Sequence, residues 1–194
     1  MASNFFAMIS RLKYIDRWAL MRNTHEENLS EHCMETACIA HALAVIGNRR
    51  FGKYYNAERA ALLGLYHDAP ETLTGDMPTP VKYYSPHIRE AYAQVEQSAC
   101  EHLVSMLPED LRADFAPLFF KDETDEELWK LVKAADKICA YIKCIEEKKA
   151  GNTEFDRAAE STLESINALD IPEAEEFMKE FLDGYRLTLD EIKE

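Results

Sequence analysis

The chain has 194 residues, 47% hydrophobic and 30% charged, which is the composition of a soluble globular protein that can bury its own core. No apolar run approaches the roughly 18 residues of a membrane span, and no secretory signal is evident at the N-terminus, so we expect a cytoplasmic protein with no membrane contact. A formal net charge of −14 argues against binding a nucleic acid polymer, although it does not exclude a single nucleotide as substrate.

Apolar residues recur at helical spacing along almost the whole chain, and no run alternates as a strand does. A first helix is expected over about residues 3–14. A second is expected to begin with Ser30 as its N-cap and to end at Gly47. We expect the following residues of this helix to face its neighbours: Met34, Ala37, Cys38, His41, Ala42 and Val45. A third helix is expected to open after Asn56.

A proline-rich stretch at 75–86 (GDMPTPVKYYSP) predicts a loop or a broken helix. Pro86 suits the first position of a fourth helix, with Ser85 as cap, running to about residue 106. Residues 108–124 are mixed and allow a short helix. The longest helix is expected over about 125–150, with an apolar stripe of Leu128, Leu131, Val132, Ala135, Cys139, Ile142 and Ile145.

Helices over about 155–169 and 173–184, with a short one after them, complete the chain. The five cysteines, an odd number without a CxxC pair, are interpreted as reduced core residues: Cys33, Cys38, Cys100, Cys139 and Cys144. No linker divides the sequence. The predicted fold class is therefore all-α, a single-domain helical bundle over residues 1–194.

The sharpest local feature is LYHDAPE at 65–71, which places His67 and Asp68 side by side at the end of an apolar helix. Pro70 removes one backbone donor, so a kink is expected there. If the helix continues, Glu71 lies one turn beyond the pair and close to both residues. Taken alone, a His–Asp dipeptide is weak evidence for a metal site and is compatible with a surface pair.

Two further side chains are candidates for the same chemistry. His32 lies in the first turn of a helix, where the dipole favours the neutral imidazole that binds metals, although it is also compatible with an ordinary first-turn residue. Asp136 is spaced with the apolar stripe of the longest helix, so it should face the core, where an ionised carboxylate needs a partner. That partner is either a metal ion or Lys133 one turn earlier, and spacing leaves both open.

Together, His32, His67, Asp68 and Asp136 would supply two imidazoles and two carboxylates. Mixed nitrogen and oxygen ligation suits Mn, Co, Fe, Ni or Zn, and differs from the thiolate-rich sites of structural zinc. A six-coordinate ion would keep positions open for water and substrate, where it can activate the water and polarise a phosphoryl oxygen.

The order His, His-Asp, Asp at positions 32, 67–68 and 136 resembles the HD-domain phosphohydrolase superfamily. Within it, the chain resembles the bacterial 5'-deoxynucleotidases over nearly its whole length, in ISRLKYIDRWALMRN, ENLSEH, LYHDAPETLTGDMPTPVKYY and VKAADKICAYIKC. The resemblance implies an all-α homodimer that removes the 5'-phosphate from deoxyribonucleoside monophosphates. It also implies one divalent ion, Co, Mn or similar, held by His32, His67, Asp68 and Asp136.

The same resemblance implies further roles. Glu71 matches the acid of HDxxE and is expected to orient or deprotonate the attacking water. Arg17 matches a phosphate-orienting arginine, and Trp18 a residue beside the sugar that would help to exclude a ribose 2'-hydroxyl. Without the resemblance, a cation–π surface pair would be preferred for Arg17 and Trp18.

The remaining substrate contacts are also implied by the resemblance. The substrate loop matches Asp76, Met77, Pro78 and Thr79, and Asp76 is further expected to take part in catalysis. The ligands His32, Asp68 and Asp136 are expected to contact substrate as well. Pro70 departs from the family pattern, leaving the ligand and acid positions intact but able to alter local geometry.

The predicted activity is hydrolysis of a deoxyribonucleoside 5'-monophosphate by in-line attack of water on phosphorus. One alternative is another HD-type enzyme, a nucleotide pyrophosphohydrolase or phosphodiesterase. A second alternative, of a different class, is a non-catalytic helical interaction protein with a vestigial metal site. The presence of both Glu71 and Arg17 argues against that second alternative.

Overall fold

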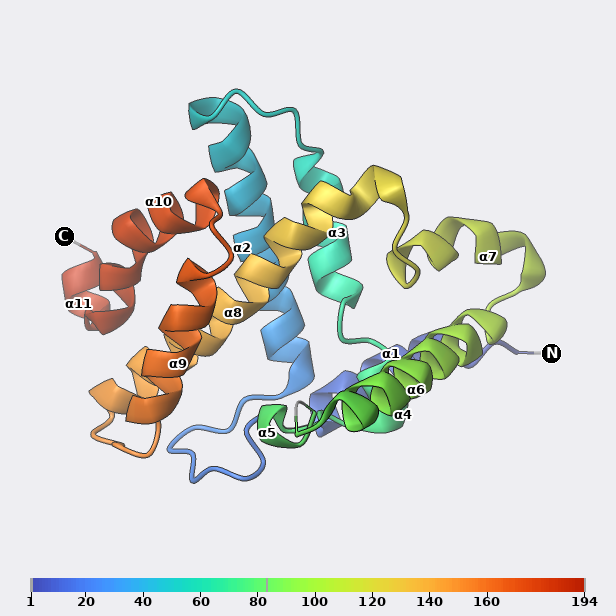
Figure 1. Cartoon of the computed structure of the whole chain (residues 1–194), viewed down its shortest axis with the longest axis horizontal. Helices are drawn as coiled ribbons and strands as arrows, with labels where there is room; N and C mark the ends of the chain where they lie inside the picture. The colour runs from blue at the N-terminus through green and yellow to red at the C-terminus, as the bar shows by residue number, and fades with distance from the viewer. Residues whose placement is uncertain (1, 83, 194) are drawn as a thin grey trace.

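The structure is a computed structural model that describes residues 2–82 and 84–193, and helices form most of it (Figure 1). The α-helices are α1 (Phe5–Ile9), α2 (Leu29–Arg50), α3 (Ala57–Tyr66), α4 (Glu71–Thr74), α5 (Thr79–Lys82), α6 (Pro86–Ser105), α7 (Glu109–Phe115), α8 (Glu126–Lys149), α9 (Asp156–Asn167), α10 (Pro172–Phe181) and α11 (Leu189–Ile192). The 3₁₀ helices are η1 (Ser10–Tyr14), η2 (Ala116–Leu118), η3 (Glu123–Asp125) and η4 (Leu182–Arg186).

The all-helical prediction is confirmed. Over the described residues, the only strand-like pairing is an isolated antiparallel bridge between Asp16 and Asn28. None of the helices in that part of the chain combines the length and apolar character needed to cross a membrane.

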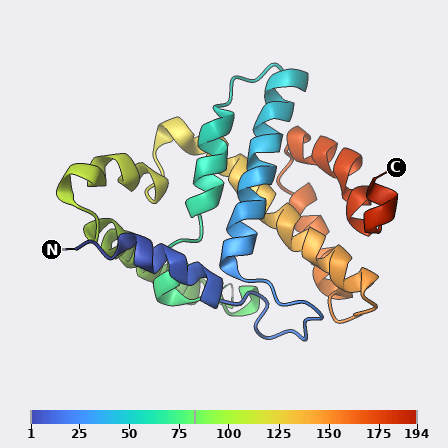
Figure 2. The same cartoon turned by 180° about the vertical axis from the view of Figure 1, so that it is seen from behind.

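Three helices form the centre of the molecule. Helices α2, α3 and α8 pack against one another, and α9 and α10 cover them on the side of the C-terminus (Figure 1). Helices α1, α4 and α6 gather in a second group, seen best from behind (Figure 2). Tyr66, Phe115 and Phe119 pack against the buried residues of both groups, so the two hydrophobic clusters are continuous. The connection from α3 to α4 passes from one group to the other.

The predictions for α6 and α8 are confirmed. Helix α6 starts with Pro86 in its first turn, and the Ser85 side chain accepts a hydrogen bond from the backbone N–H of Ile88. All seven apolar residues expected on the stripe of α8 are buried. In both helices a local signal, a cap or a one-sided stripe, agrees with the packing that the rest of the chain provides.

The prediction for α2 is wrong in its start, its end and its face. The N-cap is Asn28 rather than Ser30, because Asn28 and Glu31 form a capping box, and the helix continues past Gly47 to Arg50. The expected residues Met34, Cys38, His41 and Val45 are exposed, whereas His32, Thr36 and Leu43 are among those buried. Cys38 is therefore not a core residue, although the other four cysteines are buried.

Two further boundaries differ from expectation. The first helix is split, because α1 ends at Ile9 and the chain tightens into the 3₁₀ helix η1. The third helix does not continue through the LYHDAPE segment: it ends at Tyr66, and a new short helix begins at Glu71 with Pro70 before it. The break turns residues 67–70 into a tight connection, which is consistent with the missing backbone donor of Pro70.

Candidate metal centre

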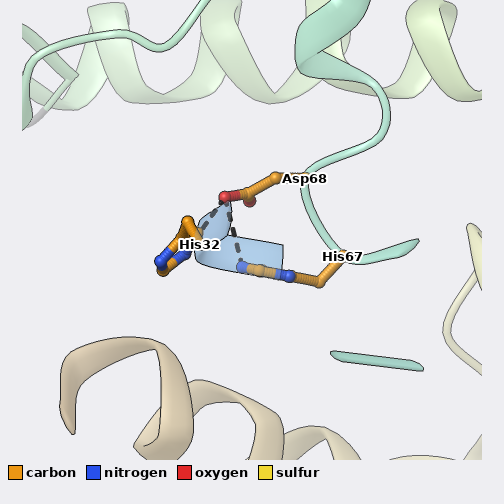
Figure 3. A group of neighbouring side chains, drawn as sticks. All are labelled: His32, His67 and Asp68. Carbon is orange, nitrogen blue, oxygen red and sulfur yellow. Dashed lines mark ion pairs between the residues drawn. The ribbon is translucent and has the colours of Figure 1, made fainter. Parts of the chain in front are cut away.

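Two histidines and one aspartate direct their side chains toward a common point (Figure 3). His32 is supplied by the first turn of α2, while His67 and Asp68 follow the last turn of α3. Oδ2 of Asp68 lies 3.5 Å from Nε2 of His32 and 3.2 Å from Nε2 of His67. One ligand atom from each residue lies within 4.8 Å of the other two, a spacing that could hold a metal ion.

Asp136 approaches this group from α8. Its Oδ1 lies 3.1 Å from Nε2 of His32, although Asp136 is outside the compact group formed by His32, His67 and Asp68. Its side chain is 38% exposed, so it lies at the edge of the apolar stripe rather than fully in the core. The ion-pair partners that the structure gives Asp136 are His32 and Arg17, and the alternative partner Lys133 is exposed to solvent.

The donor set suits a divalent cation. Nδ1 of His67 lies 2.7 Å from the carbonyl oxygen of Gly64, to which it can donate, leaving the lone pair of Nε2 free for a metal. That Nε2 is buried and has no hydrogen-bond partner among the described residues. Nε2 of His32 faces the carboxylates of Asp68 and Asp136. Mixed imidazole and carboxylate donors are typical of transition-metal sites.

The charges around this group favour ionised carboxylates. Burial opposes ionisation of Asp68 and Asp136, but the neighbouring histidines outweigh it and lower the pKa of both carboxyls. Burial also opposes a charge on His67, but Asp68 overrides it and raises the pKa of that imidazole. A metal ion binds the neutral imidazole, so protons compete with the metal for His67 and this competition strengthens as the pH falls.

Glu71 provides a buried carboxyl group next to the cluster, at the start of α4. Burial raises its pKa to about 9, and the charges of Asp68 and Asp76 add to the effect. Within the described part of the chain, its Oε2 is buried and has no hydrogen-bond partner. A group of this kind can accept a proton from water once a nearby cation favours its ionised form.

Arg17 brings a positive charge to the same place. Its Nη1 donates to Oε1 of Glu27 at 2.9 Å and contacts Nδ1 of His32, and its Nη2 lies 3.8 Å from Oδ1 of Asp136. Burial would lower the pKa of Arg17, but Glu27 and Asp136 outweigh it and raise the pKa. The guanidinium is 12% exposed and permanently charged, which suits it to bind an anion beside the cluster.

Trp18 is held by a carboxylate and by an aromatic ring. Its Nε1 donates to Oε2 of Glu27 at 3.0 Å, and its ring lies 5.3 Å from the ring of Phe155 at a tilt of 60°. The contacts that the structure gives Arg17 and Trp18 therefore meet at Glu27, rather than forming a cation–π pair at the surface.

The expected substrate loop is the connection between α4 and α5 and the start of α5. Asp76, Met77 and Pro78 are partly buried there, and Thr79 is exposed. Burial raises the pKa of Asp76, while the charge of Arg17 acts in the opposite direction. This electrostatic effect links Asp76 to the cluster.

Sequence analysis missed two acidic residues that organise this region. Glu27 receives hydrogen bonds from Arg17 and Trp18. Glu147 on α8 accepts them from Lys143, Asn152 and both the backbone and side chain of Thr24. The chain has many acidic residues, so neither Glu27 nor Glu147 stands out in the sequence. The only local signal is the four-residue spacing of Lys143 and Glu147 on one helix.

Known proteins resemble this chain over nearly its whole length. A family model described as 5'-deoxynucleotidase YfbR-like matches residues 4–185. A 5'-deoxynucleotidase yfbR of Photorhabdus temperata is 50% identical over 190 residues, which are 98% of this chain and 96% of that protein. Among solved structures, an HD-domain phosphohydrolase from Listeria innocua has a TM-score of 0.81 at 24% identity, covering 98% of this chain and 91% of that one.

A second solved structure shares the fold at lower similarity. It is the cyanophage S-2L HD phosphohydrolase DatZ, described as bound to dA and one catalytic Zn²⁺ ion, with a TM-score of 0.67 and 20% identity. The alignment covers 94% of this chain and 96% of that one. Because the family model covers most of the chain and a named relative is half identical throughout, the chain belongs to the YfbR-like 5'-deoxynucleotidase family.

Proposed function

We propose that this protein is a divalent-metal-dependent 5'-deoxynucleotidase, which hydrolyses deoxyribonucleoside 5'-monophosphates to the deoxyribonucleoside and inorganic phosphate. The observation that carries the proposal is the meeting of His32, His67 and Asp68, with Asp136 beside them. The chain is also half identical, over nearly its full length, to a protein named for this activity.

The metal ligands in this proposal are His32, His67, Asp68 and Asp136. A divalent ion held by them would lower the pKa of a bound water and polarise a phosphoryl oxygen. We propose Co, Mn or a similar ion, and the Zn²⁺ described for DatZ belongs to the same group of metals with nitrogen and oxygen ligands.

The reacting groups are assigned to Glu71 and Arg17. Glu71 orients the attacking water and takes its proton. Its buried Oε2, which has no hydrogen-bond partner in the described ranges 2–82 and 84–193, supports this role. Arg17 orients the phosphate and stabilises the charge that develops on it, because a planar guanidinium matches phosphate oxygens.

The sugar and base side of the substrate is assigned to Trp18 and the connection after α4. Trp18 lies beside the sugar and helps to exclude a ribose 2'-hydroxyl, while Asp76 contributes to catalysis and substrate binding. Met77, Pro78 and Thr79 complete the substrate loop, and His32, Asp68 and Asp136 contact the phosphate from the metal side.

A phosphate-release screen tests this function. Metal-stripped protein is reloaded separately with Mn²⁺, Co²⁺, Mg²⁺ and Zn²⁺ and is offered dAMP, AMP, dATP and a cyclic nucleotide. The proposal expects metal-dependent release of phosphate from dAMP in preference to the other three. Release of pyrophosphate from dATP, or of AMP from the cyclic nucleotide, would instead indicate one of the other HD-type activities. A metal-loaded protein inactive on every nucleotide would favour a non-catalytic role.

We further propose that the chain acts as a cytoplasmic homodimer with one domain spanning residues 1–194. The exposed apolar side chains of Met34 and Val45 on α2 support an interface, since they would gain from burial against a second copy. Light scattering after size-exclusion chromatography is expected to give twice the mass of one chain, and the mass of a single chain would contradict the dimer.

A further inference from the structure

One carboxylate joins the two side chains that the proposed function assigns to the phosphate and the sugar. Oε1 of Glu27 accepts from Nη1 of Arg17 at 2.9 Å, and Oε2 accepts from Nε1 of Trp18 at 3.0 Å. The Glu27 side chain is 13% exposed, so water competes weakly for its oxygens. Each oxygen of this carboxylate thus accepts from a different side chain, and Oε1 also lies 3.6 Å from Nδ1 of His32.

The backbone at Trp18 needs such support. Its φ is +58°, a conformation that bulky residues adopt rarely because Cβ approaches the following carbonyl group. Strained backbone persists only where surrounding contacts hold it. The carbonyl oxygen of Trp18 accepts from the backbone N–H of Met21 at 2.8 Å and from Nδ2 of Asn23 at 3.3 Å, while its side chain is held by the hydrogen bond to Glu27 and by the ring of Phe155. Removing the Glu27 carboxylate takes away the hydrogen bond that sets the direction of the indole N–H.

Glu27 occupies the base of the loop over residues 15–28, whose far side is anchored independently. At the base, the backbone N–H of Arg17 donates to the carbonyl oxygen of Glu27 at 2.9 Å, next to the bridge of Asp16 with Asn28. At the far side, Glu147 accepts hydrogen bonds from the backbone N–H and the hydroxyl of Thr24. These main-chain contacts of the loop do not use the Glu27 side chain, whereas the side chains of Arg17 and Trp18 both donate to it.

We propose that Glu27 is a positioning and specificity-determining residue: it aligns Arg17 with the phosphate and Trp18 with the deoxyribose, so that one carboxylate couples phosphate binding to sugar selection. This inference rests on the proposed 5'-deoxynucleotidase function. It assigns no contact between Glu27 and the substrate.

The test compares Glu27→Ala and Glu27→Gln with wild type, using dAMP and AMP at saturating metal. Truncation to alanine is expected to lower kcat/KM on dAMP by about 10- to 100-fold, the usual cost of losing a supporting residue, with a raised KM. It should also lower the ratio of activities on dAMP and AMP. The glutamine variant retains one acceptor oxygen, so it can serve only one of the two donors and is expected to lie in between.

The matched control is Glu26→Ala, because Glu26 is the neighbouring exposed carboxylate and should leave both constants unchanged. A variant that merely folds less well loses kcat on both substrates in proportion, with KM and the dAMP-to-AMP ratio as in wild type. That pattern, or wild-type constants throughout, would overturn the role of Glu27.

A fluorescence measurement tests the contact between Glu27 and Trp18 independently of the proposed activity. The chain has two tryptophans, so Trp129→Phe leaves Trp18 as the single emitter. In that background, Glu27→Ala is expected to increase quenching of Trp18 by acrylamide, and unchanged quenching would contradict the proposed hold on the indole. If wild type hydrolyses no nucleotide while quenching still responds to Glu27→Ala, the function fails but the positioning contact stands.

Discussion

A buried carboxyl oxygen without a hydrogen-bond partner costs stability, and Oε2 of Glu71 is such an atom among the described residues. We expect Glu71→Gln, which keeps the shape but removes the basic oxygen, to lower kcat on dAMP by about 10²- to 10⁴-fold. Metal content, measured by elemental analysis, should remain that of wild type. Near-wild-type turnover in the variant would refute the role of Glu71, and the exposed Glu90→Gln serves as the control.

Trp18 gives a second prediction for a single residue. If its indole closes the space beside the sugar, Trp18→Ala should raise activity on AMP relative to dAMP. The measurement is the ratio of kcat/KM for the two nucleotides, and an unchanged ratio would remove Trp18 from sugar selection. Trp129→Phe is the matched control, because Trp129 lies next to Lys121 and no site residue has been placed there.

Some residues of the site could be predicted from the sequence, and others could not. His67, Asp68 and Glu71 share one short motif, so their proximity was predictable. His32 and Asp136 were candidates from their helix positions with an alternative open for each, and the family resemblance added Arg17. Glu27 and Glu147 were missed because their roles depend on the groups that they bind in the folded chain. Glu147, for example, binds Thr24, a residue 123 positions away in the chain, and such pairings arise only when the chain folds.

At the scale of elements, an ion pair on α8 anchors the loop that carries Arg17. The side chains of Lys143 and Glu147 are 5% and 1% exposed, with Nζ and Oε1 2.6 Å apart. Breaking a buried pair leaves an uncompensated charge, so we expect Glu147→Gln to lower the free energy of unfolding by about 3–5 kcal/mol in urea titrations. The exposed pair of Glu127 with Lys130 is the control, and Glu127→Gln should cost less than about 1 kcal/mol.

The same pair predicts a pH dependence. Burial alone would raise the pKa of Glu147, but hydrogen bonds from Lys143, Asn152 and Thr24 lower it below its usual 4.5. A carboxyl with a lowered pKa stabilises the folded state above its unfolded pKa and loses that contribution as the pH falls. The difference in urea midpoint between wild type and Glu147→Gln should therefore be largest above about pH 5 and narrow below pH 4.5. A constant difference would contradict this account.

Close contact between α2 and α3 brings His32 near His67. A Cβ built on Gly64 would lie 2.9 Å from Cα of Ala37 and 3.2 Å from the carbonyl oxygen of Thr36, so neither helix has room for it. We expect Gly64→Ala to lower the free energy of unfolding by about 1–3 kcal/mol, measured by thermal or urea unfolding. Gly184→Ala, where a Cβ meets no atom within 4 Å, should change it little, and equal effects would argue against the close approach.

Local signals predicted some elements well and others poorly. Helix α8 has one apolar face and α6 has a serine–proline start, so both could be placed from the sequence. Helix α2 has small and apolar residues on several faces, and its buried face also contains His32 and Thr36, which a hydrophobic pattern does not select. Its orientation is decided by packing against α3 and α8, which is tertiary information.

For the whole molecule, the arrangement of helices explains why the candidate site lies where it does. Helix α2 contributes His32, the end of α3 contributes His67 and Asp68, and α8 contributes Asp136. These three helices form the packed centre of the fold, which holds their side chains in fixed relation. Arg17 comes from a loop and Glu71 from a short helix, so the groups assigned to the reaction lie on the connections around this packed centre.

The most direct test of the account is an anomalous diffraction map of crystals soaked in Mn²⁺. We predict one strong peak within bonding distance of Nε2 of His32, Nε2 of His67 and carboxylate oxygens of both Asp68 and Asp136, about 2.0–2.3 Å from each. A peak that excludes Asp136, or the lack of any peak among these four side chains in fully soaked crystals, would contradict the proposed metal centre and the hydrolysis that depends on it.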